Sequence, residues 1–223
     1  MKEGLDKIHV KKIYDKSSNY YDFYHKFGTY NLDNKGRKYL VDKIVKDGDL
    51  ILDAGGGTGT TSILALKKAG KNTIAVILDL SENMLKKAKK KATANNLQKQ
   101  ISLKVGDMYN IPFPDHHFDV VISTYSTCPL ENPANAVREM LRVLKINGLL
   151  GIAHSCEPEN KFAQIISNWI ESIIWRFPRL SLGCRKFDIS DDLKSMKINI
   201  IEDKIIGFIP WFFRLLIIQK IGN

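Results

Sequence analysis

A glycine-rich turn carries the clearest chemical signal in the sequence. Residues 53–59 read Asp-Ala-Gly-Gly-Gly-Thr-Gly and directly follow an apolar run. The residues expected to touch a ligand there are Asp53, Gly55, Gly56, Gly57 and Gly59. Glycines allow a tight turn and a close approach of the backbone, and the helix that follows presents free N–H groups. A dinucleotide site would need glycine at position 60, where Thr60 stands, and a P-loop would need a lysine, so the spacing favours a smaller nucleoside.

Two carboxylates stand at the ends of the next two predicted strands. Asp79 follows the apolar run 73–78, and Asp107 follows the run 101–105. A carboxylate at the first position can accept hydrogen bonds from both hydroxyls of a ribose. Asp107 can accept from an adenine amino group, while Met108 can pack on the adenine ring. Because the carboxyl ends of parallel strands meet at one edge of a sheet, we predict that the turn and both carboxylates form one nucleoside pocket.

Two more residues at strand ends are candidates for the chemical step. His154 ends the fifth predicted strand, at the mouth of the cleft where α/β sheets bind their ligands. It is the best candidate for a general base, which matters most for a hydroxyl or carbon nucleophile. The alternative is a histidine that is satisfied by a backbone carbonyl. Tyr125, just past the fourth strand, can stabilise a positively charged group in the cleft through its ring face.

The apolar pattern predicts the sheet that these residues require. Short apolar runs alternate with helical periods from residue 37 onward, which is typical of a parallel sheet with helices on both faces. Strands are expected at 49–53, 73–78, 101–105, 118–123 and 149–153, and helices at 60–68, from 82, at 133–144 and at 159–176. Two last strands, 198–208 and 211–219, lie too close in sequence for a parallel crossover, so they should form an antiparallel hairpin. The predicted class is α/β, a Rossmann-like doubly wound sheet, mostly parallel, with a C-terminal antiparallel hairpin.

Two further stretches resemble a known family. Residues 106–115 read Gly-Asp-Met-Tyr-Asn-Ile-Pro-Phe-Pro-Asp and are followed by Phe-Asp-Val-Val at 118–121. Residues 138–145 read Arg-Glu-Met-Leu-Arg-Val-Leu-Lys. With the glycine turn, these stretches make residues 37–154 resemble a class I S-adenosylmethionine-dependent methyltransferase, most similar to the ubiquinone/menaquinone-biosynthesis and phosphatidylethanolamine N-methyltransferase groups. Residues 146–148 read Ile-Asn-Gly where the family has Pro-Gly-Gly, which leaves one glycine for a turn.

The resemblance implies S-adenosylmethionine as the cofactor and assigns its parts to residues. Its methionine end is expected on the backbone of residues 55–59, and its ribose on Asp79. Its adenine is expected near Leu80, Met84, Asp107 and Met108. Tyr125 is expected near the transferred methyl group.

By the same resemblance, the tyrosine-rich N-terminal segment is expected to form a lid over cofactor and substrate. We therefore treat the chain as one domain, with residues 1–36 as an N-terminal helical lid and residues 37–223 as the Rossmann-like core. Tyr14 and Tyr21 are the lid residues expected to touch the cofactor. The alternative is a plain packing helix without contact to the site.

The composition is that of a basic globular protein. The 223 residues carry 34 basic and 24 acidic side chains, a net charge of +10. A basic surplus is typical of proteins that bind nucleic acid or an anionic membrane surface. Much of this surplus lies in the lysine run 86–91, which we interpret as a solvated helix face rather than a binding patch.

Cysteine usage and the apolar stretches favour a cytoplasmic protein that is soluble or touches a membrane peripherally. Cys128, Cys156 and Cys184 are widely spaced, without a C-x-x-C pair, so neither a disulfide framework nor a metal site is expected. No apolar run follows the charged N-terminus, so no secretory signal is expected. The longest apolar stretch, 205–218, is interrupted by a proline and an arginine and is too short to span a bilayer.

The methyl acceptor is argued from the surface. Residues 123–126 read Ser-Thr-Tyr-Ser, which differs from the Asn/Asp-Pro-Pro-Tyr of nucleic-acid amino methyltransferases. A helix with Trp169 and Trp175, and the aromatic tail 207–214, can dock on a membrane or line a lipid pocket. A lipid or isoprenoid-quinone head group is therefore the leading hypothesis. The alternatives are an RNA methyltransferase that uses the positive charge and a catalytically silent cofactor-binding module; the sequence does not indicate an oligomeric state.

Overall fold

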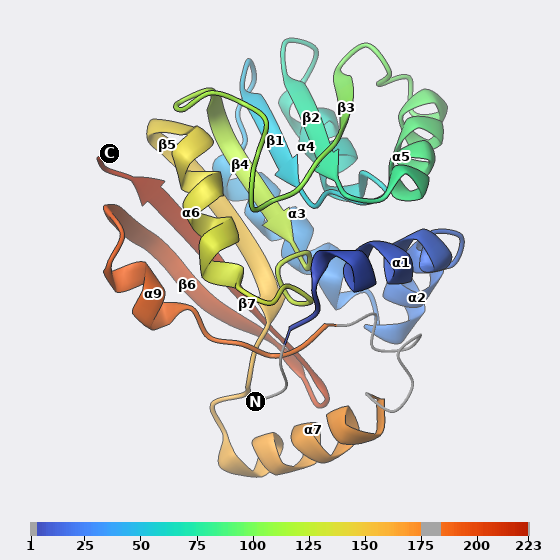
Figure 1. Cartoon of the computed structure of the whole chain (residues 1–223), viewed down its shortest axis with the longest axis vertical. Helices are drawn as coiled ribbons and strands as arrows, with labels where there is room; N and C mark the ends of the chain where they lie inside the picture. The colour runs from blue at the N-terminus through green and yellow to red at the C-terminus, as the bar shows by residue number, and fades with distance from the viewer. Residues whose placement is uncertain (1–3, 175–183, 223) are drawn as a thin grey trace.

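The computed structural model describes residues 4–174 and 184–222, apart from the side chains of residues 24–27, 171 and 174. These residues form a seven-stranded sheet with the strand order β3-β2-β1-β4-β5-β7-β6 (Figure 1). The strands are β1 Leu50–Ala54, β2 Ile74–Asp79, β3 Ile101–Val105, β4 Phe118–Thr124, β5 Leu144–Ser155, β6 Ile198–Phe208 and β7 Trp211–Lys220. The helices are α1 Lys7–Ser17, α2 Tyr21–Gly28, α3 Leu32–Ile44, α4 Thr60–Ala69, α5 Glu82–Ala94, α6 Pro133–Val143, α7 Lys161–Ile174 and α9 Ser190–Lys194.

The sheet is parallel from β3 to β5 and antiparallel at its C-terminal edge. β1 pairs in parallel with β2 and β4, β2 with β3, and β4 with β5. β7 is antiparallel to both β5 and β6. Figure 1 shows α6 on one face of the sheet, with α3 and α4 on the other. This architecture confirms the predicted class, a Rossmann-like doubly wound sheet that finishes in an antiparallel hairpin.

Two apolar clusters fill the space between the sheet and its helices. Successive residues of a strand point to opposite faces, so Leu52 and Ile51 of β1 belong to different clusters. Leu52 shares its cluster with Met140 of α6, and Ile51 shares the other with Leu40 of α3. All four side chains are fully buried, and burying a side chain of this size contributes roughly 1.5–3 kcal/mol. The two packed layers hold the strand ends in place.

The element boundaries follow the predicted pattern with one correction. Ser81 caps α5, because its hydroxyl accepts from the N–H of Met84. Residues 145–148, predicted as a turn, instead lie within β5. The pairing of β5 with β4 shifts register there, and Asn147 has a φ of 64°. The strand therefore absorbs the bend as a local irregularity and does not end at it.

Helices α1 and α2 cover the carboxyl ends of the parallel strands, where the pocket is predicted (Figure 1).

Two other helices differ slightly from the prediction in their bounds. α3 begins at Leu32, ahead of the predicted boundary at residue 37. The helix predicted at 159–176 is present as α7, and its last two residues, with Trp175, lie outside the described residues. Within residues 4–174 and 184–222, no helix has the length and apolar character needed to cross a membrane.

Candidate active site

The glycine turn connects β1 to α4. Gly55, Gly57 and Gly59 have φ values of 68°, 54° and 77°, a region that residues with a side chain rarely adopt. A Cβ atom on Gly55 would lie 2.5 Å from the Cβ of Ser126, so that position also lacks space for a side chain. The N–H of Gly55 donates to the carbonyl of Leu78 in β2 at 2.8 Å. The turn is thereby fixed against the end of the second strand.

Asp53 lies behind this turn. Its Oδ2 accepts from the N–H of Ser62 at 3.1 Å and from the hydroxyl of Ser62 at 2.7 Å, in the first turn of α4. A Cβ atom on Gly56 would lie 2.7 Å from the Cγ of Asp53. Burial raises the pKa of the Asp53 carboxyl. Asp53 thus ties the start of α4 to the end of β1, and it is not among the residues that line the cavity.

Asp79 stands at the end of β2, opposite Gly57. Its Oδ2 accepts from the N–H of Gly57 at 2.9 Å, and its Oδ1 accepts from the N–H of Ser81 at 2.8 Å. Burial raises the pKa of Asp79 to about 6, against the two backbone hydrogen bonds, which lower it. Each carboxylate oxygen has a second lone pair beyond the one that these N–H groups use. The carboxylate is therefore oriented by the backbone and can still accept from a ligand.

The end of β3 brings a second carboxylate to the same place. Oδ1 of Asp107 accepts from the N–H of Tyr109 at 2.9 Å, and Oδ2 lies 3.7 Å from the Nζ of Lys7 in α1. Met108 is buried, and its sulfur would lie 3.1 Å from a Cβ on Gly55. The ends of β1 and β3 therefore meet across the turn, as the sequence predicts.

These strand ends border a cavity with about 580 Å³ of empty space, part of it open to solvent. The predicted site residues that line it are Gly55, Gly57, Asp79, Leu80, Met84, Asp107, Met108, Tyr125, Tyr14 and Tyr21. The predicted site residues that are not among its lining are Asp53, Gly56, Gly59 and His154. Lining residues that sequence reasoning missed are Val10, Lys11, Ser81, Gly106, Ser126, Pro129 and Leu130.

The N-terminal helices close one side of the cavity. Tyr14 of α1 and Tyr21 of α2 line it together, with ring centroids 6.0 Å apart. Asp15 accepts from the hydroxyl of Ser81 at 2.5 Å. Asp22 lies 2.7 Å from the Nζ of Lys91 and accepts from the hydroxyl of Thr58 at 2.7 Å. The segment is thus tied to both the glycine turn and α5, which agrees with the lid interpretation; its opening and closing stay a prediction.

Tyr125 lines the cavity, and its hydroxyl is held by a hydrogen bond to α3. The residue follows β4 with a φ of 60° and is buried. Its hydroxyl donates to the backbone carbonyl of Asp33 in α3 at 3.2 Å, and its ring packs edge-on against Phe213 of β7. Burial raises its pKa, so the hydroxyl stays protonated. A protonated phenol is not suited to act as a base, and stabilisation of a ligand cation by the ring face stays a prediction.

A buried arginine beside the cavity was missed by sequence reasoning. The guanidinium of Arg37 lies 4.9 Å from the ring centroid of Tyr125. Its Nη1 donates to the hydroxyls of Thr124 and Thr61 at 2.7 and 3.2 Å, and Nη2 lies 3.6 Å from a carboxylate oxygen of Asp33. The sequence signal for Arg37 was its position inside the apolar face of α3, where a charged side chain that faces solvent is not expected.

His154 sits at the end of β5 but faces away from the cavity. Its ring is fully buried and stacks on Phe187 with centroids 4.3 Å apart. Its Nδ1 lies 3.0 Å from the carbonyl of Ser155. Because a carbonyl only accepts, Nδ1 carries the proton and Nε2 carries the lone pair, and Nε2 has no hydrogen-bond partner among the described residues. Burial lowers the pKa of His154 to about 4, so the ring is neutral at physiological pH; its role as a base stays a prediction.

Two cysteines far apart in the sequence meet behind the cavity. The thiol of Cys184 is hydrogen-bonded to Cys128, which lowers the pKa of Cys128 and raises that of Cys184. The N–H of Ser155 donates to the sulfur of Cys128 at 3.3 Å, and the hydroxyl of Tyr14 lies 3.9 Å from the sulfur of Cys184. Within the part of the chain that the structure describes, no cluster of histidine, cysteine and acidic residues could hold a metal ion.

Comparison with known proteins identifies the family. Residues 51–148 match a methyltransferase domain. A demethylmenaquinone methyltransferase of Lactobacillus johnsonii is 32% identical over 173 residues, which cover 77% of this chain and 70% of that protein. The chain belongs to this family. It is a class I S-adenosylmethionine-dependent methyltransferase, close to the ubiquinone/menaquinone-biosynthesis group, which confirms the resemblance found in the sequence.

Two further likenesses concern the sequence and the fold of this methyltransferase. A ubiquinone/menaquinone biosynthesis C-methyltransferase of Roseobacter denitrificans is 29% identical over 163 residues, covering 73% of this chain and 65% of that protein. The chain thus spans slightly less than two thirds of that relative. A structure titled as a putative methyltransferase from Bacillus halodurans has a TM-score of 0.68 at 20% identity, covering 83% of this chain and 99% of the other. The last likeness shows the fold.

The residues of the cavity fit S-adenosylmethionine. Around a Cβ placed on Gly57 the nearest heavy atom would be Oδ2 of Asp79 at 3.9 Å, so the turn is open for a close approach of a ligand beside an oriented carboxylate. Met84 and Met108 offer buried apolar surface for a flat ring. The rings of Tyr14, Tyr21 and Tyr125 line the same cavity and suit a positively charged ligand group. Which atoms of the cofactor each residue contacts stays a prediction.

Proposed function

We propose that this methyltransferase transfers a methyl group to a ring carbon of an isoprenoid quinol. The observation that carries the proposal is the extent of the likeness to the demethylmenaquinone methyltransferase. The matched 173 residues outnumber those of the segment 51–148, so the likeness is not confined to that segment. The second relative is also named as a C-methyltransferase of ubiquinone and menaquinone biosynthesis.

The acceptor side of the cavity has the chemistry for a flat, apolar ring with hydroxyl groups. Val10, Pro129 and Leu130 supply apolar wall. Tyr14 and Tyr21 supply hydroxyls, and burial raises the pKa of both, so they stay protonated. A protonated phenol can donate a hydrogen bond to an oxygen of the quinol ring and orient it.

The residues of the chain position the reacting groups. Bound S-adenosylmethionine supplies a methyl group on a positively charged sulfur, an electrophile that needs no further activation. Asp79 and the turn at residues 55–59 hold the cofactor in one orientation, and the tyrosines hold the acceptor; alignment of this kind can lower a barrier by roughly 7–11 kcal/mol. Three tyrosine rings in the cavity wall favour the cationic sulfur over water.

Methylation of a ring carbon also releases a proton. The new carbon–carbon bond forms at the expense of the ring π electrons, and the proton on that carbon must leave to restore the ring. We propose His154 as the residue that receives it, because its Nε2 is unprotonated and without a partner among the described residues. Its stacking on Phe187 separates it from the cavity wall, so this role requires the acceptor or a water to reach past that ring.

The test is a direct transfer assay. Purified protein is incubated with methyl-labelled S-adenosylmethionine and, separately, with a demethylated isoprenoid quinol in detergent, total RNA, and a polar metabolite extract. Label is expected in the quinol fraction. Label in RNA alone would replace the proposal with an RNA methyltransferase, and binding of the cofactor without transfer to any fraction would replace it with a silent cofactor-binding module.

A further inference from the structure

Helix α7 packs against the rest of the protein through its small residues. Ala163 and Ser167, one turn apart, are buried. The hydroxyl of Ser167 donates to the carbonyl of Pro210, in the turn between β6 and β7, at 3.2 Å. The Nζ of Lys186 donates to the same hydroxyl at 2.8 Å. The inner face of this helix therefore consists of Ala163 and Ser167, with Ile166 and Ile170 half-buried beside them.

The large apolar side chains of α7 face outward instead. Phe162, Ile165, Trp169 and Ile173 are 70%, 69%, 67% and 42% exposed. They recur at helical spacing and form one stripe, which we call the α7 stripe. In an ordinary surface helix this stripe would face the core. Here the stripe faces outward, and none of the residues that the structure describes covers it.

The turn of the β6–β7 hairpin, against which the inner face of α7 packs, carries further exposed apolar side chains. Phe208 and Ile209 are exposed at that turn, and the ring of Phe208 lies 5.7 Å from the exposed ring of Tyr30. In Figure 1 the hairpin turn and α7 lie at the lower end of the molecule, the end toward which β1 and β4 run. The cavity lies at the ends of those same strands. The exposed apolar surface and the cavity thus share one end of the protein.

The size and composition of this surface indicate its occupant. The α7 stripe together with Phe208 and Ile209 exposes roughly 650 Å², taking ~200 Å² for each fully exposed large side chain, whereas a stable interface between two copies needs about 800 Å² from each partner. The stripe lies on a protruding helix rather than in a groove, so it fits a flat or deformable partner. Aromatic and aliphatic side chains on one face of a helix are typical of helices that lie in the interfacial layer of a bilayer.

We propose that the α7 stripe and the β6–β7 turn insert into the interfacial layer of a lipid bilayer and bring the cavity to a membrane-dissolved acceptor. This inference rests on the proposed function, because an isoprenoid quinol is found in the bilayer. The partner of this surface is the interfacial layer of the bilayer, where the lipid tails meet the head groups. The surface and the cavity lie toward the same end of the protein, so this contact would bring the cavity close to the quinol head groups.

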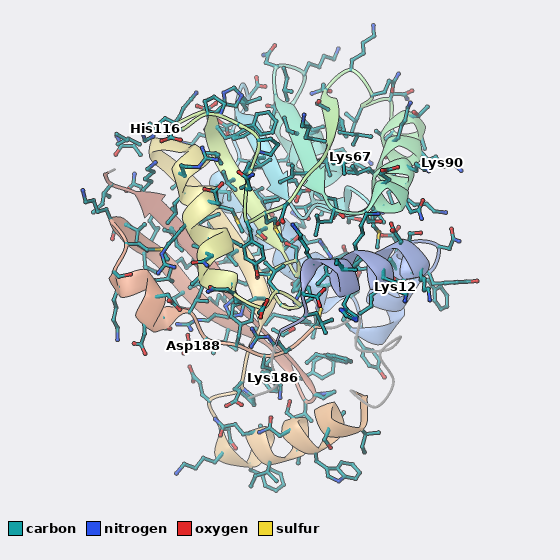
Figure 2. All side chains as sticks on the ribbon, viewed as in Figure 1. Lys12, Lys67, Lys90, His116, Lys186 and Asp188 are labelled. Carbon is teal, nitrogen blue, oxygen red and sulfur yellow. The ribbon has the colours of Figure 1, made fainter. Side chains whose placement is uncertain are left out.

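The attraction between the α7 stripe and the bilayer comes from apolar burial and not from charge. Charges of both signs surround α7: Glu157 and Glu159 precede it, Lys161 opens it, and Lys186 contacts Ser167 and Asn168 within it (Figure 2). The lysine-rich face of α5, marked by Lys90, lies at a different part of the molecule (Figure 2). Binding is therefore expected to zwitterionic lipid and to persist in high salt, since salt screens surface charges but not apolar burial.

The experiment is flotation of the full chain with vesicles of phosphatidylcholine, with and without phosphatidylglycerol, at low and high salt. Ile165→Gln/Trp169→Gln is expected to weaken vesicle binding about tenfold or more, because two inserted side chains are lost. The matched control is Ile74→Gln/Ile146→Gln, which replaces two exposed apolar residues at the opposite ends of the strands and is expected to bind as the natural protein does.

Three results would overturn the inference. One is equal loss of binding in the two double variants, and another is binding that needs phosphatidylglycerol and disappears in high salt. The third is no vesicle binding, with a dimer in solution that the α7 variant dissociates, which would assign the stripe to a second copy. Methyl transfer to a quinol in detergent is measured on the same samples. Transfer without vesicle binding would overturn only this inference, and vesicle binding without transfer would overturn only the proposed function.

Discussion

The two halves of the cavity are built in different ways. The cofactor half consists of strand ends and one turn, where backbone N–H groups orient Asp79 and positive φ values require glycine. The acceptor half is assembled from α1, α2 and the segment after β4, which meet only in the folded chain. Local geometry therefore determines the first half and long-range packing determines the second. Substitutions should separate these two dependencies.

The largest effect is expected at Arg37, which lies between the halves. Arg37→Met removes the buried partner of Asp33, Thr61 and Thr124. Breaking a buried ion pair from one side costs about 3–5 kcal/mol, and urea unfolding measures that loss. The control is Lys38→Met on the same helix, whose ion pair with Asp42 is exposed and contributes about 0–1 kcal/mol. Equal losses in the two variants would show that the arginine does not support the cavity.

The glycine turn should show the next largest effect. Gly55 and Gly48 both have positive φ, but a Cβ on Gly55 would lie 2.5 Å from Ser126 while a Cβ on Gly48 would meet nothing within 4 Å. Gly48→Ala is expected to cost about 1–2 kcal/mol of unfolding free energy from strain alone. Gly55→Ala should cost about 1–3 kcal/mol more from overpacking and should also abolish cofactor binding in calorimetry. Cofactor affinity that survives in Gly55→Ala would mean that the turn does not hold the ligand.

Asp79 should show a smaller effect with a distinct pH dependence. At neutral pH, Asp79→Ala is expected to weaken S-adenosylmethionine binding about tenfold or more, about 1.4 kcal/mol. The pKa of this carboxyl is raised to about 6, so the ionised acceptor forms as pH rises through 6 and affinity should increase over that range. Calorimetry at several pH values measures both effects, and Asp79→Ala should abolish the pH dependence.

The unliganded protein should respond to pH in the opposite sense. A carboxyl whose folded pKa is raised stabilises the fold at acid pH, and this contribution is lost as pH rises from about 4 through 6.

The control for the affinity of Asp79→Ala is Asp42→Ala, at an exposed carboxylate of α3. This variant should change neither the affinity for the cofactor nor its pH dependence. If Asp79→Ala keeps the affinity of the natural protein, the ribose site lies elsewhere.

The cofactor half was predictable because short-range rules govern it. Apolar runs located the strands, and the residues directly after three of them, near Gly55, Asp79 and Asp107, met at one cavity. The positions of Arg37 and of the Cys128–Cys184 contact depend on how α3 and the segment after α7 pack, which a single sequence does not encode locally. The α7 stripe shows a further limit: the periodicity was correct, but the pattern does not tell a core face from an outward one.

His154 illustrates the same limit at the scale of one residue. The strand end was correctly located, but side chains alternate between the two faces of a strand, and the parity of β5 turns His154 toward Phe187. Its pKa is lowered to about 4, below the usual value near 6.5. A histidine of this kind stabilises the fold above its unfolded pKa, and that stability is lost as pH falls from about 6.5 through 4.

His154→Asn is therefore expected to change the free energy of unfolding least of this series at neutral pH and clearly in acid. Asparagine keeps a donor for the carbonyl of Ser155, and it does not titrate. The free energy of unfolding should fall less between about pH 7 and pH 4.5 in the variant than in the natural protein; taking this difference within each protein cancels the packing cost of the smaller side chain. The transfer rate of the same variant tests the proposed base, since loss of a general base lowers a rate by about 10²–10⁴-fold. A smaller loss would confine His154 to a structural role and leave proton removal to water at the tyrosine-lined side of the cavity.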